Sequence, residues 1–334
     1  MPIKLTSEAK SLVPVVRKML AKNALSIASI CEAIGRNTSE VKAILKHLDV
    51  EYHGTAITLK KPTTGHIPLS VFGGDWQTYG LIGDTHLCSR FAREDALAAS
   101  YKIFAAEGIT KVFHAGNMVD GYVPRINGGD VLCSSVDDQT QYVIDHYPQH
   151  AGITTYYITG DDHEGWWQKE GFNWGNYLAM MAKQQGRNDL VYIGHVEGDV
   201  ALKNKGGTAI MKIQHPGGGS AYARSYTSQK LIESLEGGEK PAILVQGHYH
   251  VSNFMLERNV YAISLPGLQD QTIFGRKKRL RMEIGAAIIR LKQNPFDGTI
   301  SRLSVEWIRF FDRGYYKNFL DSDKRAIGKL SVET

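Results

Sequence analysis

The stretch YGLIGDTH, residues 79–86, is a short run of β-forming residues that ends abruptly in Asp84 and His86. Short apolar runs bounded by turn residues are typical of buried strands. Amphipathic segments separate this run from four others, an alternation that is typical of an α/β protein. Each of the four also ends in polar side chains: KVFHAGNMVDG (111–121), TTYYITGDDHEG (154–165), AIMKIQHPGGG (209–219) and AILVQGHYH (242–250).

The polar ends of the five runs predict one shared site, because ligands bind beyond the carboxyl ends of strands in open α/β sheets. A single histidine at a strand end is usually structural, but five such blocks in this order are hard to obtain by chance. Carboxylate and amide oxygens mixed with imidazoles suit Mn²⁺, Fe or Zn²⁺ better than Ca²⁺. Two ions ~3.5–4 Å apart can turn a shared water into hydroxide and stabilise an in-line displacement at phosphorus.

From residue 79 to about residue 270, the chain resembles the calcineurin-like metallophosphoesterase superfamily. That superfamily has the motif series D-x-H, G-D, G-N-H-(D/E), H and G-H-x-H. The resemblance implies an α/β sandwich of two mixed β-sheets flanked by helices, which hydrolyses phosphoesters with two divalent metal ions. Mn²⁺ is the favoured ion, with Mg²⁺, Fe or Zn²⁺ as alternatives. The implied metal ligands are Asp84, His86 and His250 for the first ion, and Asp162, His215 and His248 for the second, with Asn117 at the bridging position.

The resemblance also implies a catalytic group, because His163 matches the catalytic histidine of the superfamily and would protonate the leaving oxygen. Either Glu164 or Asp161 would orient its ring. The glycine-rich stretch after His215 would bring backbone N–H groups to a phosphate. Arg224 would add a charged contact, although this residue is equally well explained as a surface arginine.

Two positions depart from the pattern of the superfamily. Asn117 stands where the bridging aspartate is expected, and Asp162 stands where asparagine is expected. One interpretation is a natural exchange that preserves the charge of the site. The other is an introduced Asp→Asn change at Asn117 that weakens metal binding, since a neutral amide offers only one ligating oxygen.

A small helical domain precedes these runs. Residues 7–48 predict three helices; Asn37 and Glu40 have capping-box spacing for the third, and Gly35 ends the second. The hairpin pattern of residues 50–61 follows. This part resembles a winged helix-turn-helix domain. The expected division is 1–60 for this domain, 61–78 for a linker and 79–334 for the metallophosphoesterase domain.

Two groups of cations are candidate contacts to nucleic acid phosphates. The first lies in the helical domain, which has a protein-docking or dimerising module as its alternative. The second lies in FGRKKRLRM (274–282), which has a solvated loop as its alternative. The candidates are Arg36, Lys42 and Lys46 in the first group, and Arg276, Lys277, Lys278 and Arg279 in the second.

Composition sets wider limits. The formal net charge of +5 permits an anionic partner, and three cysteines without a C-x-x-C pair favour a reducing compartment. The N-terminus lacks a signal-peptide pattern, and no stretch has the ~20 apolar residues of a membrane helix, so we predict a cytoplasmic protein that does not bind membranes. The sequence leaves the oligomeric state open.

The predicted function is that of a two-metal phosphodiesterase, a nuclease that acts on DNA through a metal-bridging hydroxide. Within the superfamily the chain then resembles repair exonucleases and DNA-repair nucleases of bacteriophages. One alternative is a phosphatase or small-molecule phosphodiesterase. A non-enzymatic alternative is a metal-poor DNA-binding protein inactivated at Asn117.

Overall fold

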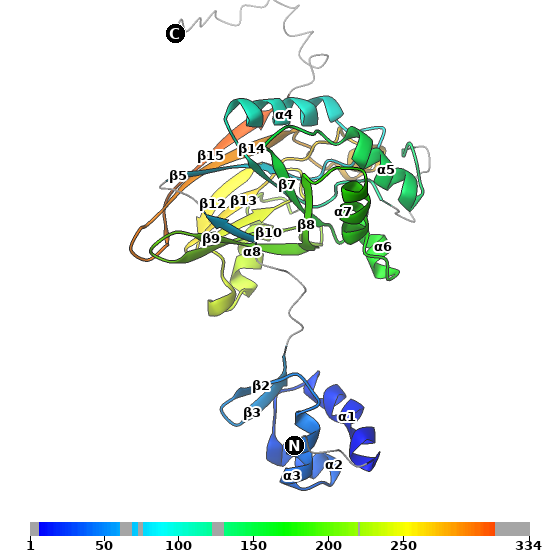
Figure 1. Ribbon diagram of the computed structural model, residues 1–334, viewed down its shortest axis with the longest axis vertical. Coiled ribbons are helices and arrows are strands. Elements are labelled where there is room, and N and C mark those ends of the chain that lie inside the picture. The colour runs from blue at the N-terminus through cyan, green and yellow to red at the C-terminus, as the bar shows by residue number, and fades with distance from the viewer. Residues whose placement is uncertain (1–6, 61–68, 73–75, 122–129, 220, 311–334) are drawn as a thin grey trace, which may run out of the picture. The chain divides into compact units, whose positions relative to one another are not determined.

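The structure, a computed structural model, describes residues 7–60, 69–72, 76–121, 130–219 and 221–310 (Figure 1). The chain divides into two compact units, Met1–Gly65 and His66–Thr334, each with a hydrophobic core of its own. Its three cysteines are free, although the Sγ atoms of Cys88 and Cys133 lie 2.8 Å apart. Among the described residues, every helix is too short or too polar to cross a membrane.

The small unit combines helices with a three-stranded antiparallel sheet of order β1-β3-β2. Its described elements are α1 (Ser7–Leu20), β1 (Leu25–Ser26), α2 (Ile27–Ile34), α3 (Thr38–Leu45), β2 (Val50–His53) and β3 (Ala56–Leu59). The predicted capping box is present at α3, where Asn37 and Glu40 each accept the other's backbone N–H. Gly35 ends α2 in the left-handed conformation at φ 62°. The three predicted helices and the hairpin are therefore confirmed.

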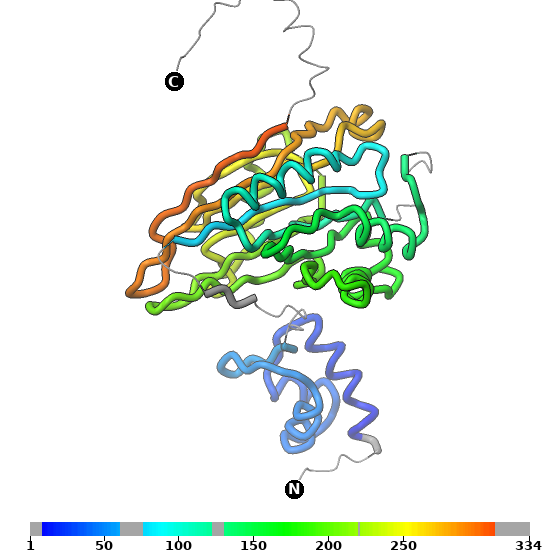
Figure 2. The backbone as a smooth tube through the Cα atoms, turned by 45° about the horizontal axis from the view of Figure 1, so that its top comes forward, coloured from blue at the N-terminus to red at the C-terminus, as the bar shows by residue number. Residues whose placement is uncertain are grey.

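The large unit contains two six-stranded sheets, both of them mixed. The first sheet has the order β15-β14-β5-β6-β7-β8, in which β5 to β8 are parallel and β14 and β15 antiparallel. Its strands are β5 (Trp76–Ile82), β6 (Lys111–Ala115), β7 (Thr154–Thr159), β8 (Leu190–His195), β14 (Gly285–Gln293) and β15 (Ile300–Arg309). Figure 2 shows that β14 and β15 lie beside β5, although more than 200 residues of chain separate Ile82 from Gly285.

The second sheet has the order β12-β13-β11-β10-β9-β4, with β10, β11 and β13 parallel to one another. Its strands are β4 (Leu69–Phe72), β9 (Glu197–Lys203), β10 (Thr208–Gln214), β11 (Ile243–Gln246), β12 (Asn253–Glu257) and β13 (Val260–Ser264). The expected linker 61–78 is wrong in part, because Leu69–Phe72 pairs with β9 and β5 starts at Trp76. The remainder, 61–68 and 73–75, lies outside the described residues.

Successive side chains along a strand point to opposite faces of the sheet, so each sheet has a separate hydrophobic core on each face. On β6, Val112 packs with helices while Phe113 packs between the sheets. On β11, Leu244 packs under α8 while its neighbours face the first sheet. The helices are α4 (Glu94–Ala106), α5 (Val136–His146), α6 (Gly165–Lys169), α7 (Trp174–Gln184), α8 (Tyr226–Ser234), the 3₁₀ turn η1 (Gly237–Glu239) and α9 (Ile273–Lys278). The predicted sandwich of two mixed sheets flanked by helices is therefore confirmed.

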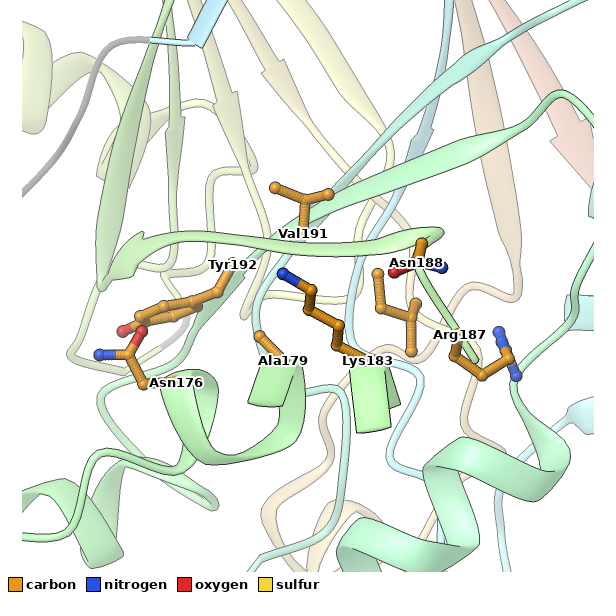
Figure 3. Close-up of a pocket in the computed structure, with 8 residues that line it drawn as sticks. Asn176, Ala179, Lys183, Arg187, Asn188, Val191 and Tyr192 are labelled. Carbon is orange, nitrogen blue, oxygen red and sulfur yellow. The ribbon is translucent and has the colours of Figure 1, made fainter. Parts of the chain in front are cut away.

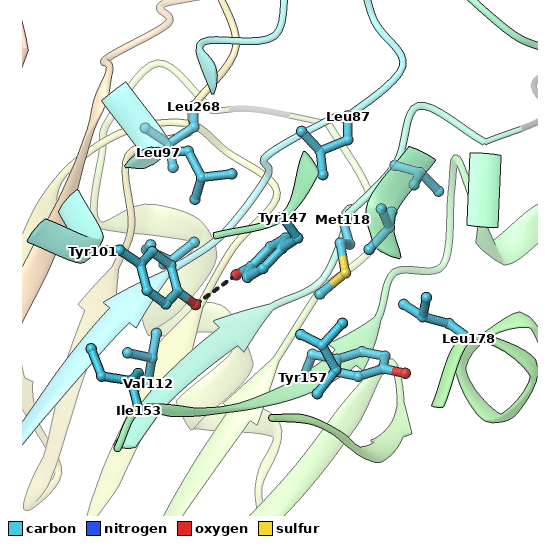
Figure 4. Close-up of a cluster of buried hydrophobic side chains, with 14 of the residues drawn as sticks. Leu87, Leu97, Tyr101, Val112, Met118, Tyr147, Ile153, Tyr157, Leu178 and Leu268 are labelled. Atoms are coloured by element: carbon cyan, nitrogen blue, oxygen red, sulfur yellow. Dashed lines mark hydrogen bonds between the residues drawn. The ribbon is translucent and has the colours of Figure 1, made fainter. Parts of the chain in front are cut away.

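The core between the helices and the first sheet is rich in aromatic residues (Figure 4). Tyr101 of α4 donates a hydrogen bond to the Tyr147 hydroxyl at 3.0 Å, which satisfies both buried phenols. Leu178 of α7 and Tyr157 of β7 complete this layer from the other side. The packing fixes the parallel strands β5, β6 and β7, whose carboxyl ends carry part of the predicted site.

Candidate metal centre

The predicted ligands all follow carboxyl ends of strands, as the sequence pattern indicated. Those on β5, β6 and β7 belong to the first sheet, and those on β10 and β11 to the second. Two hydrogen bonds join the sheets at this edge. The His215 ring donates from Nδ1 to the Ala115 carbonyl at 2.7 Å, and the His248 backbone N–H donates to Asp84 Oδ2 at 2.8 Å. One continuous site therefore spans both sheets.

The backbone of the site is unusual, because six of its residues have φ between 46° and 76°. Residues other than glycine adopt this left-handed region seldom, and such strain concentrates at functional sites. The six residues are Asp84, His86, Asn117, His163, His248 and His250.

The structure brings the first predicted ligand set together. Asp84 Oδ1 lies 3.4 Å from His250 Nε2 and 4.0 Å from His86 Nε2. Asp84 Oδ1 and His86 Nε2 are buried and have no hydrogen-bond partner. An unpaired buried polar atom is costly, and a cation held by this oxygen and two imidazole nitrogens would satisfy it. The group therefore fits a divalent metal ion.

The second predicted set is also together. Asp162 Oδ1 lies 3.2 Å from His215 Nε2, and Asp162 Oδ2 lies 3.4 Å from His248 Nδ1. The other nitrogen of each ring donates a hydrogen bond to a backbone carbonyl: His248 Nε2 to Gly218 at 2.6 Å, and His215 Nδ1 to Ala115. Such outer hydrogen bonds fix the tautomer and aim the free nitrogen at a metal. This group too is suited to a divalent ion.

The two groups differ in their charge states: the first has those that metal ligation requires, whereas the second holds an extra proton. Burial and the neighbouring His163 ring lower the pKa of His86 to about 4, so this ring is neutral. Burial raises the pKa of Asp84, but the interactions with His250, His215 and His86 together outweigh burial and hold this pKa well below its usual range. Burial lowers the pKa of His215, but the hydrogen bond to Asp162 and the charges of Asp84 and Asp162 together outweigh burial and raise the pKa to about 9. A metal ion at the second group would therefore displace a proton.

Asp120 is a site residue to which the sequence interpretation gave no role. His86 donates from Nδ1 to Asp120 Oδ1 at 3.1 Å, which leaves His86 Nε2 facing the first group. His163 donates from Nδ1 to the Asp120 carbonyl at 2.8 Å, and Gln269 Nε2 donates to Asp120 Oδ1 at 3.3 Å. The signal was in the sequence, since Asp120 follows Asn117 in the same strand-end block.

The predicted partners of the His163 ring are wrong. The Glu164 carboxylate accepts backbone N–H groups of Asn117 and Gly160 at 2.8 and 2.9 Å, and burial raises the pKa of this carboxyl to about 7. Asp161 pairs with Lys169 at 3.4 Å. Glu164 therefore holds two strand-end loops together, and Asp120 is the residue that orients the ring.

His163 lies between the two groups. Its ring is 4.4 Å from the His86 ring, measured between centroids, and its Nε2 lies 4.0 Å from Asp162 Oδ2. Burial lowers the pKa of His163, but the charges of Asp162 and Asp120 raise it above the ordinary value. The ring is thus placed to carry a proton beside both groups.

Asn117 presents a buried amide oxygen without a hydrogen-bond partner. A side chain at Gly160 would collide with this oxygen and would crowd the His215 ring, so only glycine fits there. The neutral amide therefore adjoins the second group, whose carboxylate comes from Asp162. Both interpretations of Asn117, a natural exchange with Asp162 or an introduced change from aspartate, stay predictions.

Arg224 lies at the margin of the site. It forms an ion pair with Glu283 at 2.8 Å and donates to the Ser252 carbonyl at 3.4 Å, two residues beyond His250. Its side chain is 44% exposed, so it remains accessible from solvent. Its contact to a phosphate stays a prediction.

The predicted nucleic acid contacts fall in both units. In the small unit, Arg36 pairs with Glu40 at 3.4 Å, while Lys42 and Lys46 are exposed on or next to α3. In the large unit, the basic run forms the last turn and end of α9. Its members are exposed: Arg276, Lys277, Lys278 and Arg279.

A hollow of about 350 Å³ lies elsewhere, between α7 and β8 (Figure 3). Asn176, Ala179 and Lys183 line it from the helix, and Val191 and Tyr192 from the strand. Its lining contains none of the predicted site residues, so it is separate from the candidate metal centre.

No protein-family model and no curated protein matches the chain. Among solved structures, an archaeal phosphodiesterase aligns at 15% identity with a TM-score of 0.38, covering 69% of this chain and all of that one. A predicted phosphoesterase of Streptococcus pneumoniae aligns at 13% identity with a TM-score of 0.37, over 71% and 91% of the chains. Vacuolar protein sorting 29 of Cryptosporidium parvum aligns at 14% identity with a TM-score of 0.35, over 71% and 100%. Scores this low carry no functional information.

Proposed function

We propose that the chain is a metal-dependent phosphodiesterase that cleaves DNA. The observation that carries this proposal is the pair of contiguous His/Asp groups, one around Asp84 and one around Asp162. Each group contains one carboxylate and two imidazoles, a donor set that suits Mn²⁺, Fe or Zn²⁺. Their placement beyond the strand ends of both sheets fits the order of motifs in which the sequence resembles calcineurin-like metallophosphoesterases.

Bound ions at the two groups would supply positive charge to a phosphate and activate water for attack at phosphorus. The protein supplies the rest. Asp120 orients both rings: its carboxylate accepts from His86, a candidate metal ligand, and its backbone carbonyl accepts from His163, the proton donor. His163 Nε2 is left free to deliver a proton to the leaving oxygen. Arg224 stands at the margin of the site, where a phosphate would enter.

DNA is the proposed substrate because both units expose cations. In the small unit, the turn between α2 and α3 and the hairpin β2–β3 have the order of a winged helix, and Lys42 and Lys46 project from it. In the large unit, α9 carries the basic run Arg276–Arg279. A protein that neutralises phosphates in this way binds a polyanion with strong salt dependence.

The test is a substrate comparison with Mn²⁺ present. Bis-(p-nitrophenyl) phosphate, p-nitrophenyl phosphate, and single-stranded, duplex and branched DNAs are incubated with the chain, and with His248→Ala as the control. We expect hydrolysis of the diester and of at least one DNA, and loss of both in the variant. Preference for the monoester would favour a phosphatase. DNA binding without hydrolysis under Mn²⁺, Mg²⁺, Fe²⁺ or Zn²⁺ would favour the metal-poor binding protein that Asn117 allows.

A further inference from the structure

The segment around α9 presents an unusual surface, in which two large apolar side chains are exposed next to a basic run. Phe274 is 62% exposed and Ile273 is 43% exposed. Arg281 extends the exposed cations beyond Arg276–Arg279. None of these five cations forms an ion pair with a carboxylate in the part of the chain that the structure describes. Exposed apolar side chains beside cations that lack a described carboxylate partner indicate a ligand with both apolar faces and negative charge.

The segment that leads into α9 is tied to the candidate metal centre. The Leu268 backbone N–H donates to the Asp84 carbonyl at 2.9 Å, and Gln269 donates to Asp120. Ile273 lies four positions after Gln269 in the sequence, and an extended chain spans at most about 3.6 Å per residue step. Helix α9 therefore begins within roughly 14 Å of a residue that contacts the site.

The fold holds α9 firmly enough to be a binding surface. The Thr272 hydroxyl accepts the Gly275 N–H at 3.0 Å and caps the helix. At its other end, Gln271 donates to the Leu280 carbonyl at 3.1 Å, which closes the segment on itself. The exposed Phe274 therefore lies on a short helix that is capped at its start and closed by a hydrogen bond across its ends.

We propose that α9 binds a single-stranded segment of nucleic acid beside the metal centre, with Phe274 stacked on a base and the basic run along the backbone. This inference rests on the proposed function for its orientation toward a scissile phosphodiester. Single strands offer both base faces and phosphates, whereas the bases of a duplex are stacked on each other and closed to an aromatic side chain. Aromatic residues next to a cationic track are the usual means of holding single strands.

The experiment measures binding of a fluorescent single-stranded oligonucleotide and of its duplex to the full chain without added metal and with EDTA, so that no cleavage occurs. Phe274→Ala should weaken single-strand binding roughly tenfold and leave duplex binding almost unchanged. The double variant Arg276→Glu/Lys277→Glu should weaken single-strand binding and flatten the slope of log affinity against log salt by at least about 1.4, since each lost contact removes ~0.7.

Matched controls come from the same unit. Phe296 is 89% exposed on the turn between β14 and β15, so Phe296→Ala removes an exposed aromatic residue away from α9. Lys102 and Lys205 are exposed, so Lys102→Glu/Lys205→Glu makes the same charge change elsewhere. Equal losses in the α9 variants and their controls would overturn the proposal. So would equal weakening of single-strand and duplex binding by Phe274→Ala, or binding of anionic phosphatidylserine vesicles in place of the oligonucleotide.

Hydrolysis of bis-(p-nitrophenyl) phosphate, measured separately with Mn²⁺, distinguishes this proposal from the proposed function. The α9 variants should retain it, because α9 contributes no candidate ligand. A chain that binds single strands through α9 but hydrolyses no diester would retain this inference and contradict the proposed function. Loss of diester hydrolysis in Phe274→Ala would contradict the inference, because the residue would then support the metal centre.

Discussion

Among single residues, Asp120 connects the first ligand group to His163 through hydrogen bonds. Its carboxylate accepts from His86 Nδ1, its backbone carbonyl accepts from His163 Nδ1, and Gln269 holds the carboxylate from the far side. A histidine with one nitrogen fixed in this way directs the other at its target. Asp120 therefore orients His86 of the first ligand group and the proton donor His163, although Asp120 is not among the predicted ligands.

Asp120→Asn is expected to lower the affinity of the first group for Mn²⁺ by about 10- to 100-fold, because an amide supports the His86 tautomer poorly. Competition against a chelator of known affinity measures the change. Asp138→Asn removes an exposed carboxylate from α5 and serves as the control. Unchanged Mn²⁺ affinity in Asp120→Asn would show that His86 is aligned by other contacts.

His163→Ala is expected to retain both ions and to lose turnover by about 10²- to 10⁴-fold for a substrate with a poor leaving group. The loss should be much smaller for a nitrophenyl ester, whose leaving oxygen needs no proton. Rates on both substrates and the metal content of the variant check this. A uniform loss accompanied by missing metal would mean that His163 is a ligand, as its place in the group with His86 and Asp120 allows.

Asn117→Asp adds a second carboxylate beside the second group, so it is expected to raise turnover and, through higher affinity, the metal content at limiting Mn²⁺. The buried, partnerless amide oxygen of Asn117 is the physical reason, since a carboxylate there binds a cation more strongly than a neutral amide. Elemental analysis and diester hydrolysis of the two proteins provide the comparison. Equal loading and equal rates would favour the natural exchange, with Asp162 supplying the charge.

At the scale of elements, the site depends on strands held in place by helices. Leu178 of α7 is fully buried against the first sheet, whereas Met180 of the same helix is 51% exposed. Leu178→Ala should reduce the free energy of unfolding of the large unit by about 2–5 kcal/mol, because it removes buried area and leaves a cavity. Met180→Ala should change it by less than about 0.5 kcal/mol. Denaturant unfolding of both variants tests the packing, and similar losses would contradict it.

The sequence predicted elements that are specified locally and missed those that depend on distant partners. The capping box of Asn37 and Glu40 and the five strand-end blocks are readable because each signal lies within a few residues. The sequence predicts a linker where the structure has β4, because its four residues lie in a stretch rich in Pro, Gly and Thr. These residues pair with β9, more than 100 residues away. The partner of the His163 ring was misassigned for the same reason: Glu164 is adjacent in sequence, but Asp120 is adjacent in space.

In the whole molecule, the two units have different proposed roles: the small unit contributes to DNA binding, and the large unit cleaves DNA. Lys42→Glu/Lys46→Glu should then weaken DNA binding and flatten its salt dependence by about two contacts. Hydrolysis of a small diester should be unchanged, because every candidate ligand lies in the large unit. Lys18→Glu/Lys22→Glu gives the same charge change elsewhere in the small unit. If the Lys42→Glu/Lys46→Glu variant binds DNA as tightly as this control variant, the small unit is a docking or dimerising module instead.

The central claim is that two contiguous His/Asp groups each hold a divalent ion. The most direct test is the number of Mn²⁺ ions bound per chain, measured by calorimetric titration of the metal-free protein. We expect two ions for the parent chain, and one each for His250→Ala and His248→Ala, which remove a ligand from the first and the second group. A parent chain that binds fewer than two ions, or variants that still bind two, would contradict it.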